Sequence, residues 1–67
     1  MHSVLVVGCG SIGERHLRCF LQTGRASVSG CDPSETLRDI IAQTYDVETS
    51  ADFETALTPE IDAVVIC

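Results

Sequence analysis

The chain has 67 residues, 45% of them hydrophobic, and a formal net charge of −6. A chain this short forms one domain at most, and its hydrophobic content argues against disorder. Ten acidic residues against four arginines and no lysine argue against a nucleic-acid or anionic-membrane partner, because such a partner needs a cationic surface. An anionic ligand would therefore have to be held by backbone dipoles rather than by a basic cluster.

The four cysteines do not form the pattern of a disulfide scaffold or a metal site. Cys9, Cys19, Cys31 and Cys67 include no Cys-x-x-Cys pair, and His16 with Cys19 alone cannot make a zinc site. No signal peptide opens the chain, and no stretch approaches the ~20 apolar residues of a membrane span. We therefore expect four free thiols in the reducing cytoplasm, and no bound metal.

The first elements predicted along the chain are a buried strand and a helix joined by a glycine-rich loop. The continuous apolar run 4–7 is typical of a strand buried on both faces of a parallel sheet. After the loop, apolar residues follow at helical spacing from Gly13 through Leu17 to Leu21. Gly24 is placed to end this helix in a left-handed conformation.

A second, weaker strand is expected over 26–30, followed by a second helix. Asp32 and Pro33 open this helix, with Pro33 at the first helical position and Asp32 forming a capping arrangement with Glu35. The apolar stripe of the helix consists of Leu37, Ile40 and Ile41.

The last third of the chain predicts a short edge strand, a short helix and a second fully apolar strand. The edge strand covers 47–49, Ser50 or Asp52 caps the helix, and Pro59 ends it. The final run, 63–67, is apolar throughout.

Alternating strands and helices imply a parallel sheet with right-handed crossovers. The two most apolar strands should be adjacent and the weaker ones should lie outward, which gives the sheet order 3-2-1-4. The predicted fold class is α/β: a Rossmann-type parallel sheet with helices on both faces, N-terminal half only. We therefore expect residues 1–67 to be the N-terminal part of a dinucleotide-binding domain in a longer polypeptide. The open last strand would then favour self-association.

The loop carries a Gly-x-Gly-x-x-Gly motif in the context that dinucleotide binding requires. Gly8 permits the tight turn, Gly10 lets a pyrophosphate approach the backbone, and Gly13 lets the helix pack closely on the sheet. The free N–H groups around Ser11 and Ile12 would then point at the phosphates. The alternative is an ordinary strand-to-helix turn without a ligand.

An acidic residue follows the second strand, about 20 positions after the motif, at the interval expected for a ribose-binding carboxylate. This residue, Asp32, can accept hydrogen bonds from the ribose hydroxyls and would repel a 2′-phosphate. Pro33 and Ser34 offer no cation, and the nearest is Arg38, so NAD is favoured and NADP remains an option. The alternative role of Asp32 is a helix N-cap. The predicted cofactor-binding residues are Gly8, Cys9, Gly10, Ser11, Ile12, Gly13, Asp32 and Pro33.

Neither of the reactive side chains near the motif is predicted to be catalytic. His16 lies one turn into the helix, towards the body of the fold, and is expected to be a packed or capping histidine. Cys9 is expected to fill space near the pyrophosphate, with a reactive thiol as the alternative.

Three features together resemble the Gfo/Idh/MocA family, the glucose-fructose oxidoreductase and inositol dehydrogenase group. Residues 4–16 look like the family's opening, a glycine motif extended by a histidine that matches His16. Asp32 matches the family's acid after the second strand. Segment 53–66 resembles its short aromatic-led helix followed by Pro-x-Ile-Asp-Ala-Val-x-Ile.

This resemblance implies an oxidoreductase that transfers hydride between a nicotinamide cofactor, NAD or NADP, and a CH–OH group of a sugar- or polyol-like substrate. In the family a second, α+β domain binds the substrate, and the catalytic Lys and His would lie beyond Cys67. The resemblance therefore assigns no catalytic residue to this chain, and residues 1–67 alone are expected to be inactive.

Three rival interpretations use the same glycine loop. A nucleotide-sensing module of the potassium-transporter type usually carries a Gly-Asp pair after the third strand, which 47–52 lack. A methyltransferase places an acid just before the loop, where this chain has Val6 and Val7. The third alternative is a structural fragment that binds nothing.

Overall fold

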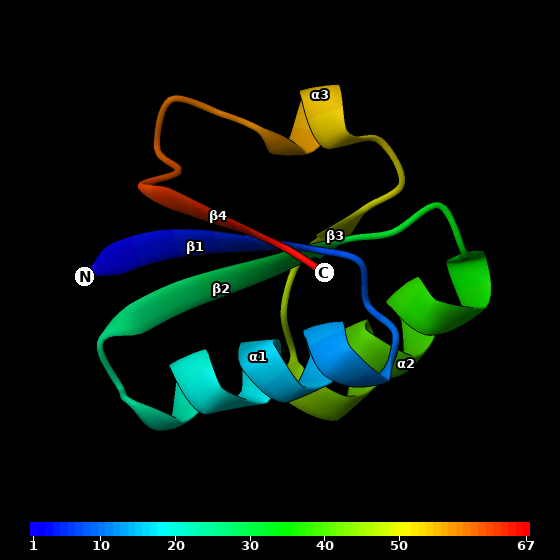
Figure 1. The fold of residues 1–67 in the computed structure, drawn as a ribbon, viewed down its shortest axis with the longest axis horizontal. Helices are drawn as coiled ribbons and strands as arrows, with labels where there is room; N and C mark the ends of the chain where they lie inside the picture. The colour runs from blue at the N-terminus through cyan, green and yellow to red at the C-terminus, as the bar shows by residue number, and fades with distance from the viewer.

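The computed structural model describes the whole chain, Met1–Cys67, as strictly alternating strands and helices (Figure 1). Its four strands form a single parallel sheet in the order β3-β2-β1-β4, which confirms the predicted topology. None of the helices is long and apolar enough to cross a membrane. The elements are β1 (His2–Val7), α1 (Ser11–Gln22), β2 (Ala26–Cys31), α2 (Glu35–Tyr45), β3 (Thr49–Ser50), α3 (Phe53–Ala56) and β4 (Ala63–Ile66).

The helices cover the two faces of the sheet unequally. In Figure 1, α1 and α2 lie together below the strands, whereas the single turn of α3 lies above them. The core sits on the side of α1 and α2, and burial of each large apolar side chain there contributes about 1.5–3 kcal/mol. It consists of Val4, Val6, Cys9, Leu17, Val28 and Ile41.

The two apolar strands differ in burial. Val4, Leu5 and Val6 of β1 are all buried, which confirms the prediction of a strand covered on both faces. β4 pairs with β1 along one edge only, and the side chain of Ile66 is 77% exposed. β1 is therefore the central strand of the core, whereas β4 forms one border of the sheet.

The third strand begins two residues later than predicted and is shorter, at Thr49–Ser50 instead of 47–49. Its register is set by bonds from the Gly30 N–H to the Glu48 oxygen (3.0 Å) and from the Asp32 N–H to the Ser50 oxygen (3.0 Å). The apolar residue that suggested an earlier strand, Val47, packs against the core instead.

The predicted start of the second helix is wrong, because the acid assigned as its cap is bonded elsewhere. Ser34 is the N-cap, and its hydroxyl oxygen accepts from the Leu37 N–H at 3.3 Å. Pro33 therefore precedes the cap instead of occupying the first helical position. The first helix begins at Ser11, two residues earlier than Gly13.

The other helix ends follow the predicted signals in part. Gly24, which follows the C-cap of α1, has a φ of 67°, as expected for a left-handed stop. Asp52 caps α3, accepting from the Glu54 N–H at 3.3 Å. The helix ends at Ala56, however, so Pro59 is not the residue that ends it.

The prediction that His16 of α1 is a packed or capping histidine is wrong. His16 is exposed, so it does not pack in the core, and the residues that cap α1 are Gly10 and Thr23. The side chain that links the two helices is Tyr45 of α2, whose hydroxyl donates to the Glu14 carboxylate of α1. This hydrogen bond stabilises the protonated phenol and raises the pKa of Tyr45.

Candidate functional site

A hollow of about 330 Å³ lies at the carboxyl ends of β1, β2 and β4, where the glycine loop joins β1 to α1. Ligands of open α/β sheets bind at this edge of the strands. We call it the glycine hollow. Its lining residues are Gly8, Gly10, Ser11, Ile12, Gly13, Asp32, Leu37 and Cys67.

Two of the three motif glycines are required by the fold itself. A Cβ on Gly13 would lie 1.6 Å from the Gly8 backbone oxygen, a distance that no packing adjustment can relieve. Gly8 has a φ of 95°, and a Cβ there would lie 2.9 Å from the Cys67 backbone oxygen. These two glycines bring the loop, the helix and β4 into close contact.

Gly10 is different, because nothing in the chain requires it to be a glycine. Its φ of −70° suits any residue, and a Cβ there would meet no atom within 4 Å. The space that a side chain would fill opens at the glycine hollow, which Gly10 lines. The packing of the protein does not require this glycine, and its open side leaves room for a group that approaches the backbone.

The N-terminus of α1 supplies hydrogen-bond donors to the same hollow. Gly10 is the N-cap and has no side chain to bond the first turn, and the first helical bond runs from the Glu14 N–H to the Gly10 oxygen (2.8 Å). The N–H groups of Ser11, Ile12 and Gly13 therefore have no acceptor in the helix. Together with the helix dipole they favour an anion, and no basic side chain is needed.

The side chain of Asp32 connects the end of β2 to the glycine loop. One carboxylate oxygen accepts from the Cys9 N–H and the other from the Ser34 N–H, both at 2.8 Å. These two bonds, that from Cys9 first, lower the pKa of Asp32, so the group is ionised at neutral pH. A carboxylate has about four lone-pair sites, so two remain for donors from a ligand.

Two predicted site residues take no direct part in the lining. Cys9 is 2% exposed and belongs to the core, where its Sγ lies 3.7 Å from the Cys31 oxygen. Burial raises the pKa of the Cys9 thiol, which favours the space-filling role over a reactive one. Its backbone N–H holds Asp32, as described above. Pro33 is exposed and lies outside the hollow.

A comparison with protein families matches residues 2–67 to the Gfo/Idh/MocA family, an oxidoreductase family with an NAD-binding Rossmann fold. The chain belongs to this family. No curated protein and no solved structure matches the chain in the corresponding comparisons. In Rossmann folds a dinucleotide binds at the carboxyl ends of the strands, and the glycine hollow lies at this edge of the sheet.

Sequence reasoning missed two of the residues that line the glycine hollow, Leu37 and Cys67. Leu37 lies in the first turn of α2, where its position depends on the corrected helix start at Ser34. Cys67 follows β4, and its N–H donates to the Val7 oxygen at 2.9 Å, which places it beside Gly8. The predicted strand order already made β4 the neighbour of β1, and that order was the signal that could have identified Cys67.

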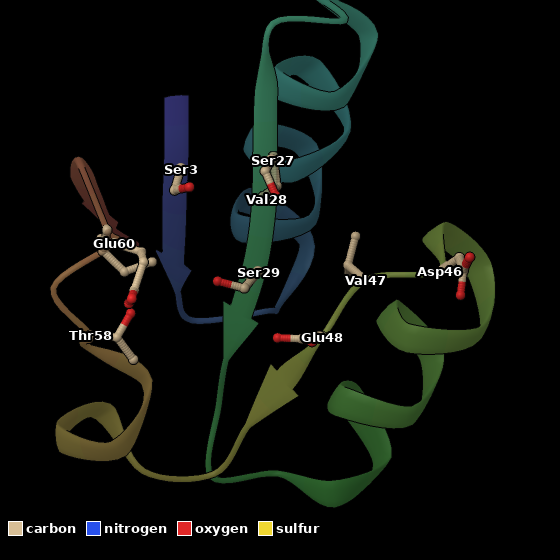
Figure 2. A pocket seen from close by; sticks show the side chains of 10 residues that line it. Ser3, Ser27, Val28, Ser29, Asp46, Val47, Glu48, Thr58 and Glu60 are labelled. Atoms are coloured by element: carbon tan, nitrogen blue, oxygen red, sulfur yellow. The ribbon is translucent and has the colours of Figure 1, made fainter. Parts of the chain in front are cut away.

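A second, larger hollow of about 530 Å³ lies against the face of the sheet away from α1 (Figure 2). We call it the serine hollow. The acids Asp46, Glu48 and Glu60 contribute to it, and no basic residue does, so it is unsuited to the dianionic linker of a dinucleotide. Its other lining residues are Ser3, Ser27, Val28, Ser29, Val47, Thr58 and Ile61.

The structure brings no three His, Cys, Asp or Glu side chains together in a geometry that could hold a metal ion. All four cysteines are free, Cys9 and Cys31 being buried and Cys19 and Cys67 exposed. The residues of the glycine hollow thus provide backbone donors, one carboxylate, one hydroxyl and one thiol.

Proposed function

We propose that the glycine hollow binds the ADP-ribose part of NAD. The observation that carries this proposal is the open space at Gly10. The fold does not need a glycine at this position, whereas a pyrophosphate that approaches the backbone closely would need one. The family supports the class of ligand, and the hollow supports its placement at Gly8, Gly10, Ser11, Ile12 and Gly13.

Each group of the hollow has a role in this proposal. The N–H groups of Ser11, Ile12 and Gly13 donate to the pyrophosphate, and Gly10 leaves room for it. The free lone pairs of Asp32 accept from the ribose hydroxyls, and its negative charge repels a 2′-phosphate. NAD is therefore favoured over NADP.

In the full-length protein, we propose, the bound nicotinamide exchanges hydride with a CH–OH group of a sugar- or polyol-like substrate, the redox chemistry being that of the cofactor. We assign no catalytic acid or base within residues 1–67, and place the catalytic groups in a C-terminal substrate domain. Residues 1–67 by themselves are then inactive and associate through the unpaired edge of β4. Four free cysteines favour the cytoplasm as their compartment.

The substitution Gly10→Ala tests the proposal directly. We expect the free energy of unfolding to change by no more than about 1 kcal/mol, because the new methyl group meets no protein atom. The affinity for ADP-ribose should fall at least about tenfold, or ~1.4 kcal/mol, because the methyl group occupies the pyrophosphate position. Calorimetric titration measures the affinity, and thermal unfolding measures the stability.

Gly24→Ala is the matched control, since it makes the same chemical change far from the hollow. Gly24 has a φ of 67°, so an alanine there should cost about 1–2 kcal/mol of stability and leave the affinity unchanged. The proposal is contradicted if the folded wild-type chain does not bind ADP-ribose, or if Gly10→Ala binds it as well as the wild type.

A further inference from the structure

The charges of the chain are divided between two parts of its sequence. Residues 15–31 contain three arginines and no acid, whereas the remaining residues hold all ten acids and one arginine, so the two parts carry formal charges of +3 and −9. That fourth arginine, Arg38, is bonded within the chain, because its Nη1 donates to the Asp32 oxygen at 2.9 Å and to the Pro33 oxygen at 3.0 Å. A chain with this asymmetry presents surfaces of opposite sign.

The positive charges lie on α1 and on the turn that follows it. Arg15 and Arg18 are exposed and, three residues apart, they lie on the same side of the helix. Arg25 is exposed in the turn that leads to β2. Leu17, by contrast, is buried in the core between α1 and the sheet. We call Arg15, Arg18 and Arg25 the basic surface.

The serine hollow lies against the opposite face of the sheet and is acidic on both sides. In Figure 2, Glu60 lies on one side, Asp46 and Glu48 lie on the other, and Ser27 and Ser29 of β2 lie between them. The two sides belong to the segments that lead into β4 and β3, which are the outermost strands of the sheet. Four strands at a spacing of about 4.8 Å span about 14 Å, which is enough for an α-helix about 10–12 Å in diameter.

We propose that the serine hollow binds the basic surface of a second copy of this chain. The hollow needs a cationic occupant, since three acids and no base line it, and α1 supplies exposed arginines on an element of matching width. The guanidinium groups donate to the carboxylates at the sides and to the serine hydroxyls between them. This contact does not depend on nucleotide binding.

The arrangement of the two surfaces makes the contact head-to-tail. The basic surface and the serine hollow lie on opposite sides of the sheet, so each copy offers its hollow to one neighbour and its helix to another. Pairing between β4 edges is a different contact, because it joins backbone groups and needs no charge. Sensitivity to salt and the position of the contact therefore distinguish the two.

Two double variants isolate a single contact of this kind. Arg15→Glu with Arg18→Glu, the arginine variant, reverses the charge of the basic surface and keeps the hollow intact. Glu48→Gln with Glu60→Gln, the glutamate variant, neutralises the hollow and keeps the basic surface intact. All four side chains are exposed, so both variants should fold. Neither should bind a second copy of itself in this way, whereas the two together should.

The experiment is an NMR titration of the isotope-labelled arginine variant with the unlabelled glutamate variant, without nucleotide. The amide signals of Ser27 and Ser29 should shift to saturation, and those of β4 should not. Raising sodium chloride from about 25 to about 250 mM should weaken the binding at least about tenfold, because opposite charges hold the contact. The unlabelled arginine variant, used as the titrant instead, should cause no shift.

A matched pair of substitutions in the labelled chain tests the acids of the hollow. Adding Glu35→Gln and Asp39→Asn, which removes two exposed charges from α2, should leave the shifts unchanged. Adding Glu48→Gln and Glu60→Gln, which removes the same charge from the hollow, should abolish them.

The proposal is overturned if the signals of Ser27 and Ser29 do not shift, if the shifts are confined to β4, or if they survive the loss of Glu48 and Glu60. Shifts of α1 signals with the polyanion heparin, and never with a second copy, would also overturn it in favour of another partner. If the arginine variant unfolds, the labelled wild type takes its place, and salt-sensitive shifts at Ser27 and Ser29 decide in the same way.

Discussion

The two hollows of this molecule are built from different parts of the chain, although the same sheet supports both. The glycine hollow is lined mainly by backbone and small side chains, and its one carboxylate accepts two N–H groups. The serine hollow is lined mainly by side chains, among them three acids and no base. The larger of the two is therefore the one less suited to the nucleotide.

The difference shows how a chain of net charge −6 can offer an anion site. The attraction comes from a helix N-terminus and free N–H groups, and such dipoles need no lysine. Glu48 and Glu60 line the serine hollow, whereas Asp32, the one acid that lines the glycine hollow, has its charge stabilised by hydrogen bonds. Size alone would favour the serine hollow, whereas the chemistry of the donors favours the glycine hollow for an anion.

The largest expected effect comes from a change in the backbone that forms the glycine hollow. Gly13→Ala places a Cβ 1.6 Å from the Gly8 backbone oxygen, so α1 must move away from the loop. We expect a loss of more than about 4 kcal/mol of stability, which would unfold a domain of this size. Circular dichroism during thermal or urea unfolding measures the loss.

The serine hollow should tolerate the equivalent change, because side chains and not backbone contacts line it. Ser29→Ala, on β2, should alter the stability by no more than about 0.5 kcal/mol. If Gly13→Ala were as stable as Ser29→Ala, the contrast between a hollow made of backbone and one made of side chains would be wrong.

A smaller effect is expected from placing a negative charge at the N-terminus of α1. Ser11→Asp should raise the free energy of unfolding by about 0.3–1 kcal/mol, because the new carboxylate is attracted to the positive N-terminal end of the helix dipole. The same charge should weaken ADP-ribose binding at least about tenfold, since it competes with the pyrophosphate for the free N–H groups. Stability and affinity therefore change in opposite directions.

Glu48→Gln provides the control in the serine hollow. Removing this negative charge should leave the affinity for ADP-ribose unchanged if the nucleotide lies at the glycine hollow. An increase in affinity after Glu48→Gln, with none lost after Ser11→Asp, would place the nucleotide in the serine hollow instead.

Sequence patterns predicted those parts of the fold that depend on local periodicity and on continuous apolar runs. The apolar residues of β1 indicated its central place, and the strand order followed from it. The start of α2 and the position of β3 were missed because both depend on partners far along the chain. Asp32 accepts from Cys9 instead of capping α2, and backbone bonds from Gly30 and Asp32 set the register of β3.

The candidate site was predictable where one short motif determines it. The spacing of Gly8, Gly10 and Gly13 indicated the loop, but only the structure separates Gly10, which the fold does not need, from the other two. The inward direction of the Cys9 side chain and the position of Arg38 behind Asp32 depend on packing and on side-chain reach. Such features have no signature in residue spacing.

The smallest expected effect is a dependence of stability on acid pH that comes from the bonds of Asp32. Because hydrogen bonds from the Cys9 and Ser34 N–H groups lower its folded-state pKa, Asp32 stabilises the fold only while it is ionised. Its contribution is complete above the pKa of the unfolded chain, about 3.9 for an aspartate, and is lost as the pH falls through the lower folded-state pKa. The free energy of unfolding of the wild type should therefore fall more steeply below about pH 4 than that of Asp32→Asn.

Glu60→Gln sharpens this measurement, because it removes an acid of the serine hollow instead. The pKa of Glu60 is also lowered, first by the Thr58 hydroxyl and then by its own backbone N–H, but both partners are local in the sequence. Those bonds join no separate elements, whereas Asp32 joins the turn after β2 to the glycine loop. Urea unfolding at several pH values should show a shallower acid slope for Asp32→Asn than for Glu60→Gln. Equal slopes would mean that the bonds of Asp32 contribute no more to acid-dependent stability than the local bonds of Glu60 do.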